Sequence, residues 1–368
     1  MARAALLAAL LALACVLGCS RESKVPSGVL AGSGGEGGMG AAGGVAGGAQ
    51  PAAGGGQAGS NSGGNVSGGS AGTEAGGTGE GGESPAVQCG SASPEACWRG
   101  LYLSPYTDHS GQVTFGGETE QHLYILDDAQ KRELVLDFID AQDIDSLSLY
   151  DLPTILEDAD LKAALLAFVQ AARQRGVVEV NAIGSLSKPA WDTIATTQTE
   201  SQLFDGLVTE IEFWNPGATF QEFQDIAAYV RSLEMKTPDG RDMPLAAYIG
   251  RPTPEQFSAL LPLVDRLLVH VYVKSAELAY GYGQERFAAI AAGNAGLGRA
   301  VEVRPIFSAE GEVWAAGPEH FMGEWVSTHS LPEAEATFLT AWEAEAGVMP
   351  PLTGFQYYDY FYLERYLQ

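Results

Sequence analysis

The chain has 368 residues, of which 46% are hydrophobic, and its formal net charge at pH 7 is −26. No stretch rich in Lys and Arg interrupts this acidity, and so negative a field repels phosphates, which argues against a nucleic-acid partner. A neutral or cationic partner fits better, although solubility alone also explains an acidic surface.

Residues 1–19 have the pattern of a signal peptide. Arg3 precedes an apolar run that extends over residues 4–17 and is followed by Gly18 and Cys19. So short a run, with small residues at its end, indicates a cleaved signal and not a membrane span. The sequence Val-Leu-Gly-Cys resembles the lipobox of bacterial lipoproteins, which implies a lipid on Cys19. The alternative is an ordinary secretory signal with an incidental cysteine.

The same resemblance implies where the protein resides. Ser20 follows the cysteine, and the absence of Asp there implies an outer-membrane lipoprotein of the cell envelope, facing the periplasm or the exterior. Its contact with the membrane would be the N-terminal lipid alone. Residues 20–85 are mostly Gly, Ala and Ser, which bury too little apolar surface to offset the entropy of ordering. We therefore expect a disordered tether.

Two cysteines remain at the start of the segment 86–368, which we expect to fold. Cys89 and Cys97 enclose a short loop, and in an oxidising compartment the simplest expectation is a disulfide between them. No other cysteine and no cluster of histidines accompanies them, so a metal site is not expected.

Apolar runs of strand length then alternate with segments of helical period. The expected strands are residues 99–104, 144–152, 177–185, 203–214, 243–251, 264–273, 300–308 and 352–362, and the expected helices are residues 131–142, 161–176, 220–235, 253–264, 284–296 and 332–347. Eight strands in about 280 residues predict a (β/α)8 TIM barrel as one domain. An open doubly wound sheet is the alternative, but it usually has a glycine-rich phosphate loop after an early strand.

Active sites of such barrels lie at the C-terminal ends of the strands, so polar residues there are the candidates. The fourth expected strand contains Glu210 and Glu212, which are two residues apart and should therefore share one face. A third carboxylate, Glu310, follows the seventh strand. Aromatic or polar residues near the other strand ends, or beside the two glutamates, are expected to bind substrate: Trp214, Asn215, Tyr248, Arg251, His270, Tyr272, Tyr358 and Asp359.

This combination of carboxylates and aromatic rings suits a sugar. Cleavage of a glycosidic bond requires a proton donor and a second group that stabilises positive charge at the anomeric carbon. A carboxyl group in a partly apolar site beside another carboxylate has a raised pKa and can serve as the acid. Glu212, nearer the strand end, is the candidate donor, and Glu210 would hold or orient its proton.

The segment FDGLVTEIE resembles the D-x-x-D-x-D-x-E signature of family 18 glycoside hydrolases, the chitinase-like enzymes. Asp205 matches the first Asp and thereby joins the expected substrate-binding set, and Glu212 matches the acid. Val208 and Glu210 stand at the other two aspartates. The resemblance implies a TIM barrel and Glu212 as general acid. His270 and Tyr272 lie where the family has M-x-Y-D.

A wider likeness, in LYDLPTIL, EIEFW, RLLVHVY and PIFSAE, connects the chain to secreted bacterial barrel proteins of unestablished activity. It implies the barrel and a role for Glu210, Glu212 and Glu310, but no substrate. Many retaining glycosidases place an acid/base after strand four and a nucleophile after strand seven, which suggests Glu212 and Glu310 as a second pairing.

Structural roles for the same residues are the alternative. Glu210 could pair with Arg251 or Arg304, Glu310 could be a solvated surface residue, and His270 could be a hydrogen-bonded core histidine. Two hypotheses on function therefore stand. The first is a surface-anchored glycoside hydrolase-like enzyme without a cofactor, and the second is an inactive barrel that binds glycan or cell-wall fragments.

Overall fold

A computed structural model describes residues 89–90, 97–106, 124–310, 321–345 and 347–367. The expected signal peptide, the lipidated Cys19 and the tether all lie outside the described residues. Within the described part, no helix is both long enough and apolar enough to cross a membrane.

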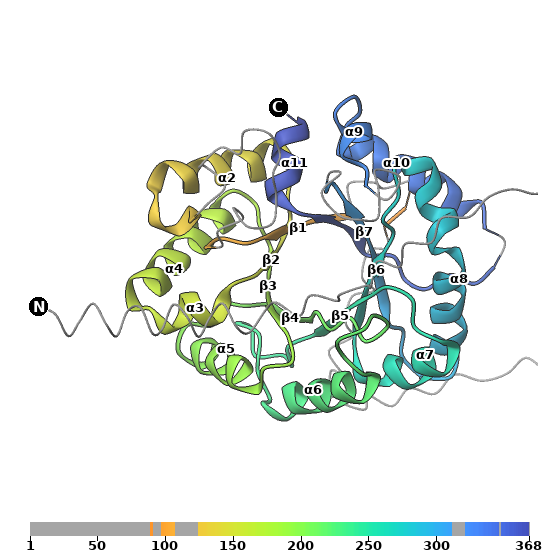
Figure 1. Ribbon diagram of the computed structural model, residues 1–368, viewed down its shortest axis with the longest axis horizontal. Coiled ribbons are helices and arrows are strands. Elements are labelled where there is room, and N and C mark those ends of the chain that lie inside the picture. Colours follow the sequence, from red (N-terminus) through yellow and green to blue (C-terminus); the bar gives the residue numbers. More distant parts are fainter. Residues whose placement is uncertain (1–88, 91–96, 107–123, 311–320, 346, 368) are drawn as a thin grey trace, which may run out of the picture. The chain divides into compact units, whose positions relative to one another are not determined.

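Parallel strands form a closed barrel in chain order, each hydrogen-bonded to the next and the last to the first (Figure 1). Their bounds are β1 Trp98–Leu103, β2 Ser146–Leu149, β3 Glu179–Gly184, β4 Gly206–Thr209, β5 Leu245–Ile249, β6 Arg266–His270, β7 Glu302–Ser308 and β8 Gly354–Tyr358. The predicted (β/α)8 barrel is confirmed, and the open sheet is excluded because β1 pairs with β8 in register from Trp98 with Gly354.

Helices surround the barrel (Figure 1). Their bounds are α2 Ala129–Ala141, α3 Leu152–Glu157, α4 Ala159–Gln174, α5 Lys188–Ser201, α6 Phe220–Ser232, α7 Pro254–Leu260, α8 Ala276–Asn294, α9 Gly323–Val326, α10 Leu331–Glu343 and α11 Tyr360–Leu367, with short 3-10 turns η4 Ile125–Asp127 and η5 Leu261–Leu263. Thr219 and Ser330 begin α6 and α10 with capping boxes, which satisfy the first free N–H groups. The helix α5 was not predicted.

Most strands are shorter than predicted, and at their C-terminal ends the largest differences are in β4 and β8. β4 ends at Thr209 because residues 211–215 turn sharply, with Asn215 N donating to Glu212 O at 2.9 Å. β8 ends at Tyr358, and residues 360–362, predicted as strand, begin α11. Both differences lie at the C-terminal end of the barrel.

The side chains divide between two apolar regions. Most buried residues pack between the sheet and the helices, as a TIM barrel requires. A separate cluster fills the barrel, and its buried members come from six strands: Tyr102, Ile183, Val208, Ala246, Tyr248, Leu268 and Ile306. Because strand residues alternate between faces, these are the inward positions.

A buried ion-pair network closes the N-terminal end of the barrel. The Glu179 carboxylate accepts hydrogen bonds from Arg304 Nη1 at 2.8 Å and Arg266 Nη1 at 2.9 Å. Asn181 Nδ2 donates to it at 2.9 Å and Ser146 Oγ at 3.1 Å. Although burial opposes its charge, the two arginines hold the pKa of Glu179 well below its usual range.

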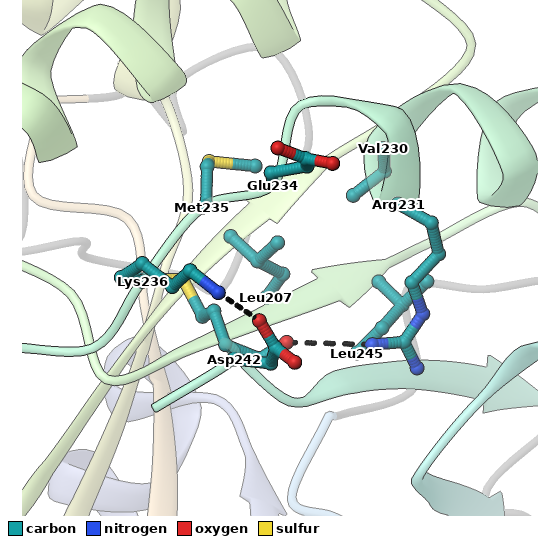
Figure 2. Close-up of a pocket in the computed structure, with 9 residues that line it drawn as sticks. Leu207, Val230, Arg231, Glu234, Met235, Lys236, Asp242 and Leu245 are labelled. Atoms are coloured by element: carbon teal, nitrogen blue, oxygen red, sulfur yellow. Dashed lines mark hydrogen bonds and ion pairs between the residues drawn. The ribbon is translucent and has the colours of Figure 1, made fainter. Parts of the chain in front are cut away.

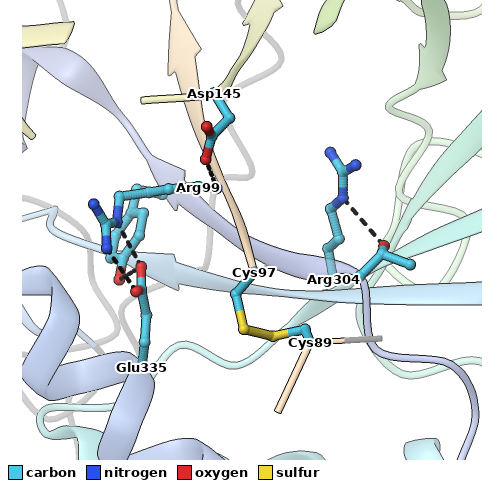
Figure 3. The surroundings of a disulfide bond; sticks show 8 residues. Cys89, Cys97, Arg99, Asp145, Arg304 and Glu335 are labelled. Carbon is cyan, nitrogen blue, oxygen red and sulfur yellow. Dashed lines mark hydrogen bonds and ion pairs between the residues drawn. A yellow bond between two sulfur atoms is a disulfide. The ribbon is translucent and has the colours of Figure 1, made fainter. Parts of the chain in front are cut away.

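The predicted disulfide between Cys89 and Cys97 is present, with Cα atoms 4.4 Å apart (Figure 3). Cys97 directly precedes β1, and Cys89 N donates to Leu352 O at 3.2 Å, just before β8. Nearby, Arg99 Nε donates to Glu335 Oε1 at 2.6 Å and so ties β1 to α10. The disulfide therefore lies next to the pairing of β1 with β8 that closes the barrel.

Candidate functional site

Glu210 lies at the C-terminal end of the barrel, one residue past β4. Its backbone N–H donates to Gly184 O at 3.1 Å, which extends the pairing with β3 by one step. The residue is partly buried, and Tyr150 lies beside its carboxyl group. Its position is therefore fixed by the rigid sheet and not by a loop.

The carboxyl group of Glu210 holds its proton unusually strongly. Burial raises the pKa of Glu210 to about 7, and the charges of Glu212 and Glu310 add to the rise while Tyr150 opposes it. Near neutral pH the Glu210 carboxyl group is therefore close to half-protonated, so it can hold or release a proton in that range.

Glu212 lies further out, on the turn that follows β4. Its side chain is exposed, and Asn215 Nδ2 donates to its Oε2 at 2.8 Å. Trp214, on the same turn, packs against Tyr248 with ring centroids 5.4 Å apart. The structure thus brings four predicted residues together at one side of the mouth. They come together because the chain turns after β4, and the alternation of strand side chains no longer applies past Thr209.

Two further carboxyl groups approach from β7 and β8. Glu310 is buried, with 6% of its surface exposed, and its Oε2 accepts a hydrogen bond from Ser308 Oγ at 2.8 Å. Burial raises the pKa of Asp359 to about 8, and the charge of Glu310 contributes to the rise. The alternative hypothesis, that Glu310 is a solvated surface residue, is therefore wrong.

Aromatic rings surround these acids. Tyr102 packs on Tyr150 at 5.7 Å and on Tyr358 at 5.5 Å between ring centroids, and Tyr272 packs on Tyr358 at 6.3 Å. Burial raises the pKa of each of these tyrosines well above its usual value, so their hydroxyls stay neutral. Tyr102 was not among the predicted site residues. The signal for it is its inward position on β1, next to Leu101 and Leu103 of the outer face.

His270, the last residue of β6, belongs to the same aromatic wall. Its ring lies 3.7 Å from that of Tyr272 and 6.0 Å from that of Tyr248, measured between centroids. On its other side, at 6.2 Å, is Tyr282 of α8. His270 thus connects the candidate site to the space between α7 and α8.

The structure separates two predicted residues from this group. Asp205 precedes β4 at the N-terminal end, where its Oδ2 accepts hydrogen bonds from Arg173 Nη2 and Val180 N, both at 2.8 Å. The expectation that Asp205 binds substrate at the mouth is therefore not supported by its position, because strand direction puts it at the opposite end. Arg251 lies on the β5–α7 connection and donates to Tyr282 Oη at 3.1 Å.

Arg251 and Arg304, the alternative ion-pair partners of Glu210, bind other residues in the structure. Arg304 binds Glu179, and Arg251 binds Tyr282. Within the described ranges neither arginine forms an ion pair with Glu210. Among the same residues no cluster of three or more His, Cys, Asp and Glu could hold a metal ion.

A cavity of about 430 Å³ lies away from these acids (Figure 2). Leu207, Val230 and Leu245 form part of its wall, and Lys236 donates to Asp242 at its rim. Beside the cavity, Met243 N donates a hydrogen bond to Met235 O at 3.0 Å. The residues come from the end of α6 and the start of β5, so the cavity belongs to the N-terminal side of the sheet.

No family model matches the chain, and a search of curated proteins finds no match. Solved structures with a similar fold include a xylanase and α-amylase inhibitor protein from Scadoxus multiflorus, at 13% identity over 73% of this chain and 94% of that one, with a TM-score of 0.41. Concanavalin B is 12% identical over 73% and 95% of the two chains, with a TM-score of 0.39. An endo-β-N-acetylglucosaminidase from Cordyceps militaris is 12% identical over 72% and 81%, with a TM-score of 0.37. At this similarity no function follows, and the fold rests on the strand order.

Proposed function

We propose that the barrel binds a carbohydrate and hydrolyses a glycosidic bond by carboxylate acid/base catalysis. The observation that carries the proposal is the group of Glu210, Glu212 and Glu310 at the C-terminal mouth, where Glu210 has a pKa of about 7 inside a wall of tyrosines. Aromatic faces suit the CH surfaces of sugar rings, and the three acids supply what glycoside cleavage requires.

Each acid has a distinct part in this mechanism. Glu212, exposed at the mouth, delivers a proton to the leaving oxygen as the C–O bond breaks. Glu210 holds or orients that proton before the transfer. Glu310, buried and oriented by Ser308, stabilises the positive charge at the anomeric carbon. Water then adds to that carbon and gives its proton to a carboxylate, which restores the acid.

The test is hydrolysis of a panel of oligosaccharides by the wild type and by Glu212→Gln, Glu210→Gln and Glu310→Gln. We expect each variant to lose about 10²–10⁴-fold in rate on the cleaved sugar. Glu200→Gln, an exposed change on α5, is the matched control and should leave the rate unchanged. A wild type that cleaves no sugar, or a Glu212→Gln variant as fast as wild type, contradicts the proposal.

A non-catalytic carbohydrate-binding barrel is the second candidate, and one observation favours it. Val208 is inward-facing and 1% exposed at the position where the chitinase-like signature has an aspartate, so a packed isopropyl group stands in place of that carboxylate. Sugar binding that survives in a wild type without hydrolysis would establish this function instead.

We also propose that the chain is anchored in the cell envelope by a lipid on Cys19. The sequence of residues 1–19 supports this, and residues 20–85 would then form the tether. Cell fractionation tests it, since Cys19→Ser should move the protein from the membrane fraction to the soluble fraction. An unchanged distribution contradicts the anchor.

A further inference from the structure

A second cavity, of about 380 Å³, lies beside the candidate site, between the β5–α7 connection and α8. Figure 1 shows α7 next to α8 at one side of the barrel. Arg251 and Arg286 both line it, and Pro252, Pro254 and Phe257 form an apolar wall. In a chain with a net charge of −26, two arginines at one cavity are a local reversal of sign.

These arginines differ from most others in the barrel in the partners of their guanidinium groups. Arg173, Arg231 and Arg266 bind acidic side chains at 2.6–2.9 Å. Among the residues that the structure describes, Arg251 and Arg286 form no ion pair. Their positive charge is therefore available to a ligand.

Arg286 is a fixed part of the wall. It is 8% exposed, and its guanidinium donates to Gly250 O at 3.0 Å, to Tyr282 O at 2.7 Å and to His270 O. These bonds join the ends of β5 and β6 to α8. The arginine therefore fixes the cavity and contributes a buried positive charge.

Arg251 is the residue that can bind directly. It is exposed, and its guanidinium lies over the Tyr282 ring at 5.3 Å from the centroid while Nη2 donates to Tyr282 Oη. One ring therefore orients the guanidinium, and its other N–H groups remain for a ligand. A planar guanidinium held in this way matches the two oxygens of a carboxylate.

We propose that this cavity, the Arg251 cavity, is a subsite for an acidic sugar residue bound through its carboxylate. The aromatic contacts from Tyr282 through His270 to Tyr272 and Tyr248 connect it to the candidate catalytic acids. The inference rests on the proposed function, because it names uronic-acid-containing oligosaccharides as the substrate class. Glu285, the one acid on the described lining, sets a limit on how much negative charge the subsite accepts.

The test measures binding by the full chain to oligosaccharides that end in a uronic acid. The same oligosaccharides with that carboxyl reduced to an alcohol are the neutral partners, and inorganic phosphate is a separate probe. We expect the acidic form to bind about tenfold or more tightly than the reduced form. Arg251→Gln should abolish this preference, and Arg251→Lys should restore only part of it.

Two further variants make the result specific. Arg241→Gln removes an exposed arginine at the other end of the barrel, where it pairs with Asp239 at 2.8 Å, and should leave the preference unchanged. Glu285→Gln should strengthen binding of the acidic form. Equal binding of both forms, no binding of either, or phosphate binding as tight as that of the uronate overturns the proposal.

The outcome is separable from that of the hydrolysis test. Arg251-dependent binding of a uronate that is never cleaved supports the subsite and contradicts the enzyme. Cleavage of neutral sugars alone, with no preference for the acidic form, supports the enzyme and contradicts the subsite.

Discussion

The two ends of the barrel place a glutamate in opposite electrostatic environments. At the N-terminal end, Arg266 and Arg304 compensate Glu179 and keep it ionised despite its burial. At the C-terminal end, Glu210 has acidic neighbours and a tyrosine, and burial raises its pKa to about 7. The residue type is the same, and the neighbours supplied by adjacent strands decide its charge.

The difference teaches where stability and chemistry reside in this chain. A compensated carboxylate contributes to the fold only while its partners stay, since a buried charge without a partner is costly. An uncompensated one weakens the fold once it ionises but keeps a proton that can be transferred. The following predictions test this contrast, from the largest expected effect to the smallest.

Glu179→Gln should cause the largest loss of stability. It leaves Arg304 without its carboxylate and Arg266 with only Glu302, so we expect the free energy of unfolding to fall by about 3–5 kcal/mol. Denaturant titration measures this. Glu302→Gln, at the partly exposed rim of the same network, should cost less than about 1 kcal/mol, and equal losses for both variants would refute the special role of Glu179.

Removing the disulfide should have the next largest effect. Replacing Cys89 and Cys97 together by Ser frees a loop closed over a sequence separation of 8, which should cost about 2–3 kcal/mol. Reduction of the wild type should lower its unfolding midpoint to that of the double variant. Reduction should leave the midpoint of the double variant unchanged. A wild type insensitive to reduction would contradict this.

The acids at the C-terminal end should make stability fall as pH rises. The folded pKa of Asp359 is about 8, above the usual 3.8, so the folded state binds its proton more tightly than the unfolded state does. The stabilisation is complete below about pH 4 and is lost as pH rises through 8. Asp359→Asn should remove most of this decline.

The control for the pH series is Asp225→Asn on α6, where the side chain is exposed and accepts from Gln221 Nε2 at 2.8 Å. Its stability should follow the wild-type decline between pH 4 and pH 8. An Asp359→Asn variant that shows the full decline would mean that another group is responsible.

The smallest effect is expected at Asn215. Its bond to Glu212 is exposed, so Asn215→Ala should change the free energy of unfolding by less than about 0.5 kcal/mol. Because the bond orients Glu212, hydrolysis should still slow by roughly threefold. Unfolding and rate measurements on the same sample separate the two effects, and an unchanged rate would leave Asn215 without a positioning role.

The sequence predicted the barrel because its strands are nearly continuous apolar runs separated by helical periods. It did not predict where β4 and β8 end. Ile, Phe and Trp continue past Thr209, and Tyr, Phe and Leu continue past Tyr358, so local propensity does not show that the chain turns at these two points. The helix α5 was missed because four threonines weaken its apolar pattern.

The sequence predicted the carboxylates of the candidate site better than it predicted which residues surround them. Glu210 and Glu212 are only two residues apart in sequence, so their proximity could be expected. The electrostatic interaction between Glu310 and Asp359 depends on the pairing of β7 with β8, whose register cannot be predicted from periodicity alone. Asp205 was assigned to the mouth by motif, although its position before β4 determines the opposite end.

The pairing of β1 with β8 has a consequence for biosynthesis. While the chain emerges from the ribosome, β1 has no partner on one side until β8 has been synthesised. A chain that stops before Gly354 would expose two unpaired sheet edges, β1 and β7, each ready to pair with another molecule. A chain that lacks β8 should therefore form aggregates and not a smaller barrel.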